Sequence, residues 1–155
     1  MGFVKYILIC TLFAFQLFVG IPDFLHGDDY WLCAATYPFF HASWIHFSIN
    51  AIAIWGIYGR SCKPCRDLLF PYIISLVVYP LSFRPVIGFS NILYAVLGMR
   101  TPPFSSPWWK SRNVIIFISV TLLMAFLPQF SATTHIAAFL LGIAGAYVSR
   151  YIQKK

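Results

Sequence analysis

Residues 88–100 read Gly-Phe-Ser-Asn-Ile-Leu-Tyr-Ala-Val-Leu-Gly-Met-Arg, an apolar segment with a serine near its start and a charge at its end. With a rise of about 1.5 Å per residue, a helix of this length covers about 20 Å, whereas the hydrocarbon core of a bilayer is about 30 Å thick. If Arg100 lies at the interface, Ser90 lies well inside the membrane. A hydroxyl at that depth requires either a packing role or a chemical one.

The composition is that of a membrane protein. Of the 155 residues, 60% are hydrophobic and 10% are charged, whereas a soluble domain carries about 25% charged residues. We therefore expect one all-α membrane domain over residues 1–155, with no soluble domain. Polar, Pro-rich or charged stretches separate six apolar segments, and the predicted spans cover residues 4–20, 41–58, 68–83, 88–99, 113–130 and 135–151.

The basic residues predict the orientation. With the N-terminus inside, every Lys and Arg except Arg84 falls on the cytoplasmic side, as the positive-inside rule requires. We expect a multi-pass protein of the plasma (inner) membrane, with both termini in the cytoplasm. Since topology accounts for the net charge of +7, no nucleic-acid partner is expected.

The cysteines and acids limit the chemistry. Cys62 and Cys65 could form a redox pair or half a metal site, but reduced thiols are favoured in a cytoplasmic loop. The chain has no glutamate, which excludes an H-E-x-x-H zinc motif, and no aspartate lies within a predicted span. No cofactor and no metal site are predicted. The alternative is a metal site with His41, His46 and His135 as ligands. It would leave the other polar residues of the spans unexplained.

Polar residues collect at one depth. Spans two, four and six all run from outside to inside, so their first residues share one level near the outer face. The polar residues at that level are His41, His46 and Asn50 in span two, Ser90 and Asn91 in span four, and Thr133, Thr134 and His135 in span six. Polar groups inside a bilayer are costly and are often functional.

This layer supports acyl-transfer chemistry. Ser90 becomes a nucleophile if a base takes its proton, and His135 is the histidine on a third span at the right level. Without an in-span acid, the sequence favours a Ser-His dyad, with Tyr94 as a candidate to support the imidazole. His46 and Asn50, one helical turn apart, supply hydrogen-bond donors for a developing oxyanion. Alternatively, these two residues hold helices together.

Small residues predict close packing of spans four and six. A small-xxx-small stripe on span six lets a neighbouring helix approach closely. On span four, three residues share the corresponding face. The stripe is Ala138, Gly142 and Ala146, and the facing residues are Ser90, Tyr94 and Gly98.

Three motifs hold the polar residues of this layer: His41-Ala-Ser-Trp-Ile-His46-Phe-Ser-Ile-Asn50, Gly88-Phe-Ser90-Asn-Ile-Leu-Tyr94-Ala-Val-Leu-Gly98 and Thr134-His135-Ile-Ala-Ala-Phe-Leu-Leu-Gly142. By these motifs the chain resembles the rhomboid family of intramembrane serine proteases, in its minimal six-span form. The motifs match the family patterns in order, spacing and predicted topology over nearly the whole chain. Asn91 stands where glycine commonly follows the serine, and Ala138 replaces another family glycine.

The resemblance implies a six-helix rhomboid-like bundle whose short, recessed fourth helix starts at the catalytic serine. Ser90 would be the nucleophile and His135 the general base. His46 and Asn50, with the Ser90 amide, would form the oxyanion hole. The supporting residues would be Gly88, Gly98, Ala138 and Gly142, Tyr94 packed on the imidazole, and His41 in a structural or pocket-lining role.

We expect an intramembrane serine endopeptidase that cleaves single-span membrane proteins near the outer face of the bilayer, without a cofactor. Substrate would enter between spans two and five, near Phe126, Leu127, Pro128 and Phe130. Three alternatives stay open: an inactive rhomboid-like protein that binds transmembrane helices, a sorting-type relative that trims C-terminal anchors, and a small transporter.

Overall fold

The computed structural model describes residues 3–19, 29–58, 65–82, 86–101, 107, 110–124 and 130–152. Within these ranges all regular structure is helical, which confirms the all-α prediction. Cys62, Phe126, Leu127 and Pro128 lie outside the described residues. The elements are α1 (Phe3–Phe18), α2 (Tyr30–Thr36), η2 (Tyr37–Phe39), α3 (Trp44–Ile57), η3 (Cys65–Leu69), α4 (Phe70–Val78), η4 (Tyr79–Leu81), α5 (Ser90–Met99), α6 (Arg112–Met124) and α7 (Ala132–Ile152).

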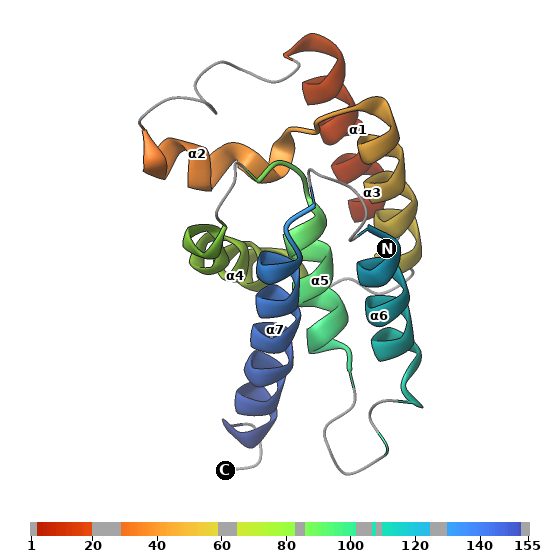
Figure 1. The fold of residues 1–155 in the computed structure, drawn as a ribbon, viewed down its shortest axis with the longest axis vertical. Coiled ribbons are helices and arrows are strands. Elements are labelled where there is room, and N and C mark those ends of the chain that lie inside the picture. Colours follow the sequence, from red (N-terminus) through yellow and green to blue (C-terminus); the bar gives the residue numbers. More distant parts are fainter. Residues whose placement is uncertain are drawn as a thin grey trace.

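Helix α5 forms the centre of the bundle. In Figure 1 it lies between α7 on one side and α3 and α6 on the other, while α4 packs against both α5 and α7. Every residue from Asn91 to Gly98 is buried. A helix that is apolar all round has no face to offer to water, and it is stable only when neighbours cover it. The short segment around Ser90 is therefore a core helix.

Helix lengths differ from those of the predicted spans. Only α7, at Ala132–Tyr151, is long and apolar enough to cross a membrane by itself among the described residues, and α1, α3, α5 and α6 are apolar but shorter. The predicted span 68–83 is divided into a π-helical turn (η3), an α-helix (α4) and a 3₁₀ turn (η4). Pro71 and Pro80 stand in the first turns of α4 and η4, where the missing N–H costs no helical hydrogen bond.

The start of α3 is set by a cap. The Ser43 side chain accepts a hydrogen bond from the backbone N–H of His46 at 3.2 Å, so the helix begins at Trp44. His41, predicted at the start of this span, therefore precedes the helix.

Helix α2 lies between the first two predicted spans, where the sequence predicts no span. The side chain of Asp29 caps it by accepting from the Leu32 N–H at 3.0 Å. The chain then passes through η2, where Tyr37 is fully buried against the bundle. Figure 1 shows α2 running across the bundle toward the end where α3 and α5 begin.

Helices α5 and α7 are in backbone contact. A Cβ added to Gly98 would lie 2.1 Å from the Phe139 carbonyl oxygen, and one added to Gly142 would lie 2.2 Å from the Ala95 carbonyl oxygen. Ala138, on the same face of α7, is fully buried. We call this contact the glycine seam. It leaves no room for a larger side chain at either glycine.

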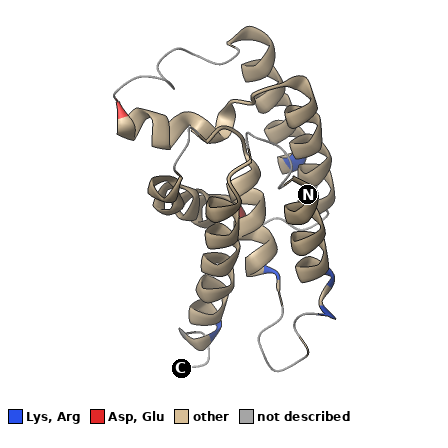
Figure 2. Cartoon of the chain, in the orientation of Figure 1, with Lys and Arg blue, Asp and Glu red and all other residues tan. Residues whose placement is uncertain are grey.

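Charge is distributed unevenly along the bundle. Figure 2 shows Lys and Arg at the ends of α5, α6 and α7 that lie together, and an acidic residue at the start of α2, toward the other end. The basic residues of these three ends are Arg100, Lys110, Arg112 and Arg150.

Candidate active site

Ser90 and His135 are brought together from the starts of two packed helices. The Ser90 Oγ lies 2.7 Å from the His135 Nε2, and the other ring nitrogen, Nδ1, lies within hydrogen-bond distance of the Ser131 carbonyl oxygen. Because a carbonyl oxygen only accepts, Nδ1 carries the proton in this arrangement and Nε2 offers its lone pair to the serine hydroxyl. A hydroxyl, a ring nitrogen whose lone pair is directed to it, and a group that orients the ring are the arrangement that an activated nucleophile requires.

Ser131 takes the orienting place that an acid holds in a triad. It stands one residue before α7 and one helical turn before His135, and its carbonyl also accepts the His135 backbone N–H at 3.3 Å. Ser131 is not among the site residues predicted from the sequence, because its contact is made by a backbone carbonyl, which any residue type can supply. Its position four residues before the histidine is the one sequence signal that points to it.

Two aromatic rings hold the imidazole. Tyr94 meets it edge-on, with ring centroids 4.6 Å apart and planes at 70°. Phe130 stacks on it at 4.3 Å and 18°. The sequence analysis assigned Tyr94 to this contact but placed Phe130 only near the substrate entrance. Phe130 in fact touches the His135 ring and also lines the cavity described below.

Gly88 is required by its conformation and by its surroundings. Its φ of 118° lies in the region that side chains rarely adopt, and an added Cβ would lie 2.6 Å from the Cε1 of His46. Its N–H donates to the Tyr37 carbonyl oxygen at 3.0 Å. The turn before Ser90 thus packs directly on the imidazole of His46.

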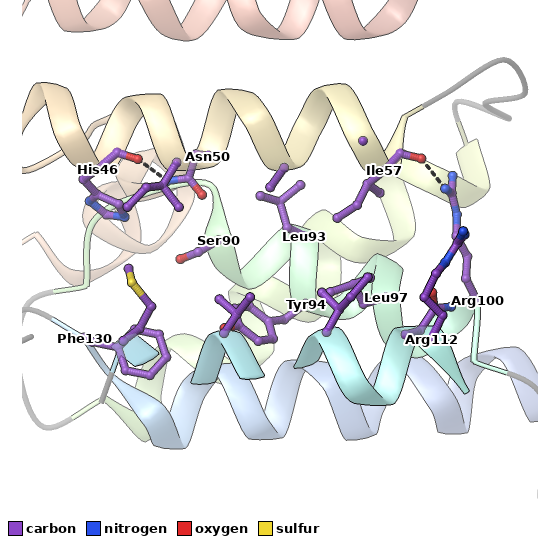
Figure 3. A pocket seen from close by; sticks show the side chains of 17 residues that line it. His46, Asn50, Ile57, Ser90, Leu93, Tyr94, Leu97, Arg100, Arg112 and Phe130 are labelled. Carbon is purple, nitrogen blue, oxygen red and sulfur yellow. Dashed lines mark hydrogen bonds between the residues drawn. The ribbon is translucent and has the colours of Figure 1, made fainter. Parts of the chain in front are cut away.

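His46 and Asn50 line the same cavity as Ser90. Figure 3 shows both side chains on α3, across from the serine hydroxyl, with Phe130 on the other side. The Asn50 Nδ2 donates to the His46 carbonyl oxygen at 3.3 Å, which uses one of its two N–H bonds. His41 is fully buried, and its ring meets that of His46 edge-on at 5.3 Å.

Asn91 is fixed by a buried hydrogen-bond chain. Its Nδ2 donates to the Tyr37 hydroxyl at 2.9 Å, and that hydroxyl donates to the Ser75 carbonyl oxygen at 3.2 Å. Burial raises the pKa of Tyr37 to about 12, so the phenol keeps the proton that it donates. Tyr37 therefore holds the residue after Ser90 by its side chain and Gly88 by its carbonyl group.

A cavity of about 580 Å³ runs along α5 from the Ser90 hydroxyl to Arg100 and Arg112. Its walls are α3 and α6, and its floor is α5 (Figure 3). We call it the substrate groove, for the role that we propose for it. Its lining residues are His46, Ile49, Asn50, Ala53, Gly56, Ile57, Ser90, Leu93, Tyr94, Leu97, Arg100, Arg112, Asn113, Ile116, Val120, Met124 and Phe130.

The comparisons with known proteins agree with the resemblance seen in the sequence. The family model of the rhomboid domain matches residues 28–152, which include every residue of the site described above. No curated protein matches the chain. Rhomboid proteins are mostly serine proteases that act on membrane proteins within the bilayer, and the family also has inactive members. The chain therefore belongs to the rhomboid family and is an integral membrane protein.

Proposed function

We propose that this protein is an intramembrane serine endopeptidase with Ser90 as nucleophile and His135 as general base, in one membrane domain over residues 1–155. The observation that carries the proposal is the 2.7 Å contact between Ser90 Oγ and His135 Nε2, with Nδ1 directed to the Ser131 carbonyl. His135 is buried, and Ser90 is half-buried where it lines the groove. The aligned serine hydroxyl and the Nδ1 bond to the Ser131 carbonyl, which stabilises the imidazolium, favour proton transfer from the hydroxyl to the ring.

In the proposed reaction, Ser90 Oγ forms a bond to the carbonyl carbon of the peptide while its proton moves to His135 Nε2. The imidazolium then gives that proton to the leaving nitrogen, the C–N bond breaks, and an acyl-enzyme ester remains. A water molecule gives one proton to the same imidazole, and its oxygen attacks the ester carbon. The C–O bond to Ser90 breaks, and the proton returns from His135 to the serine oxygen.

The developing oxyanion needs donors on the α3 side of Ser90. His46 and the second N–H of Asn50 face the groove there, and the Ser90 backbone N–H is the third candidate. The N–H groups of the first helical turn have no partner within the helix, which leaves the Ser90 amide available at the start of α5. Gly88, Gly98, Ala138, Gly142, Tyr94 and His41 would support this arrangement.

The proposed topology has six spans, formed by α1, α3, the α4 region (η3, α4 and η4), α5, α6 and α7, with both termini in the cytoplasm of a plasma-membrane protein. In this orientation the dyad lies nearer the outer face. We propose that single-span membrane proteins enter between α3 and α6. The substrate groove between these two helices supports this route, because α6 packs on α5 and makes little direct contact with α3.

The proposal is tested with purified protein, a single-span substrate with a destabilised helix, and a fluorophosphonate that labels activated serines. Wild type should cleave and be labelled. Ser90→Ala should abolish both, and His135→Ala should lower the labelling rate by roughly 100-fold to 10,000-fold. Ser48→Ala is the matched control, because Ser48 is an exposed helical serine that bonds only to the Trp44 carbonyl.

Labelling that persists in Ser90→Ala would contradict the assignment of the nucleophile. Wild type that neither cleaves nor labels, yet captures the intact substrate helix, would make the protein an inactive helix-binding member of the family.

A further inference from the structure

A second cavity, of about 810 Å³, lies at the basic end of the bundle and takes no part in the proposed reaction. It is enclosed by the start of the α4 region, the end of α5 and the last turns of α7. Part of its wall is apolar, contributed by Phe70, Met99, Ala146 and Val148. We call it the basic cavity.

Arginines from three separate segments line this cavity: Arg66 from η3, Arg100 from the end of α5 and Arg150 from α7. One carboxylate faces them. Asp67 is buried, with its Oδ1 at 2.7 Å from the Arg66 Nε and its Oδ2 at 3.6 Å from the Arg100 Nη2. Three guanidinium groups against one carboxylate leave a net charge of +2 at the cavity.

These guanidinium groups can reach a ligand from outside. The side chain of Arg66 is 55% exposed and that of Arg100 is 31% exposed, whereas Asp67 is 3% exposed. Asp67 thus holds the Nε and Nη2 of Arg66 and lies near the Nη2 of Arg100, and part of both guanidinium groups stays exposed. Arginine forks bind phosphate oxygens in pairs, which makes a phosphodiester the ligand that this chemistry favours.

The surroundings determine the source of that phosphate. The chain is an integral membrane protein, and the ends of α5, α6 and α7 that carry basic residues lie together (Figure 2). Basic pockets between transmembrane helices bind anionic lipid headgroups. The apolar wall offers a surface for the first carbons of an acyl chain. A free phosphate ion has no apolar part that would contact this wall, so the wall favours a lipid.

We propose that the basic cavity binds an anionic phospholipid, with its phosphate held by Arg66, Arg100 and Arg150 and its acyl carbons against Phe70 and Val148. Arg100 also donates to the Ile57 carbonyl at the end of α3 and lines the substrate groove. Bound lipid therefore holds the shared ends of α3, α5 and α7 together. A ligand that binds only the folded state raises its stability. The site is independent of the proposed hydrolysis.

The test measures lipid binding by native mass spectrometry of the purified full chain in non-ionic detergent. Phosphatidylglycerol and phosphatidylcholine with identical acyl chains are titrated separately. Phosphatidylglycerol should bind at least tenfold more tightly, and Arg66→Gln with Arg150→Gln should remove that preference. The matched control is Lys110→Gln with Arg112→Gln, which removes the same charge from the same end but outside the cavity and should change the affinity less than twofold.

Arg150→Gln alone serves as a second variant, since it leaves both partners of Asp67 in place; it should lower the affinity for phosphatidylglycerol at least threefold. Equal binding of the two lipids would overturn the proposal. So would an equal loss in the control pair, which would mean general charge attraction. Displacement of phosphatidylglycerol by millimolar glycerol phosphate would also overturn it, because the site would then take a free anion.

Discussion

Helix α5 has two unlike sides. Toward α7, the glycine seam brings Gly98 and Gly142 into contact with opposing carbonyl groups, and nothing larger than a hydrogen fits. Toward α3 and α6, the same helix borders a groove of about 580 Å³. One helix therefore has a backbone contact with no room for a Cβ on one side and a wide opening on the other.

The two sides of α5 have separate roles: the glycine seam positions Ser90 against His135, and the groove provides open space beside Ser90. Ser90 begins α5 and His135 lies in the first turn of α7, so the seam fixes the distance between them. Close-packed contacts hold side chains within narrow limits, which a dyad needs. The groove side carries His46 and Asn50 and leaves space for a substrate. Changes on the seam should therefore affect stability and chemistry together, and changes at groove positions away from His135 and the proposed oxyanion donors should affect substrate cleavage alone.

Breaking the seam should have the largest effect. We expect Gly142→Ala and Gly98→Ala each to lower the free energy of unfolding by about 3 kcal/mol, the upper part of the range for overpacking, because the added methyl meets a backbone oxygen that cannot rotate away. The rate of fluorophosphonate labelling should also fall in both variants. Unfolding is followed by denaturant titration in detergent micelles.

The matched control for the seam is Gly56→Ala in α3, where nothing lies within 4 Å of an added Cβ. Its stability should equal wild type or exceed it by up to about 1 kcal/mol, since alanine favours helix. Equal losses at Gly56 and Gly142 would show that the seam is not a special contact.

Removal of the hydrogen bonds of the Tyr37 hydroxyl should cause the second largest loss of stability. Tyr37→Phe leaves the Asn91 amide and the Ser75 carbonyl without this partner, and an unsatisfied buried group costs about 1–3 kcal/mol. Asn91→Ala leaves the bond to Ser75 in place, so we expect about 1 kcal/mol. Tyr30→Phe, at a 41% exposed position of α2, should stay within about 0.5 kcal/mol. A loss in Tyr30→Phe as large as that in Tyr37→Phe would show that the effect does not depend on the hydrogen bonds of the Tyr37 hydroxyl.

Much of this arrangement was predictable from spacing. Helical periodicity placed His46 beside Asn50 and aligned Tyr94 with Ser90, and the small residues predicted the contact of α5 with α7. These are local or repeated patterns, so a single sequence carries them. The assignment of Ser90 and His135 as catalytic residues stays a prediction until the variants are measured.

The rest depends on features that leave no residue pattern. The Ser131 carbonyl orients His135 through the backbone, and Tyr37 reaches Gly88 and Asn91 across about 50 positions of sequence. Only the fold brings those segments together. The cap of α2 is different, because Asp29 before an apolar stretch is a readable N-terminal signal that the sequence analysis did not use.

Filling the groove should separate substrate access from chemistry. Ala53 lines the groove on α3, and Ala53→Phe should slow cleavage of a helical substrate about tenfold. Stability and labelling by a small fluorophosphonate should change little, because the new ring occupies open space. The control is Ile52→Phe, on a 74% exposed position of the same helix. Equal slowing by Ile52→Phe would place the substrate elsewhere.

Phe130 belongs to both sides of this comparison, since it stacks on His135 and also lines the groove. An aromatic contact of this kind is worth about 0.5–1.5 kcal/mol, so Phe130→Ala should lower the labelling rate about threefold to tenfold by loosening the imidazole. Phe130→Tyr keeps the ring and should restore most of that rate. If Phe130→Ala slowed substrate cleavage but left labelling unchanged, its ring would act only at the groove. A loss in both assays, rescued by tyrosine, assigns it to positioning the base.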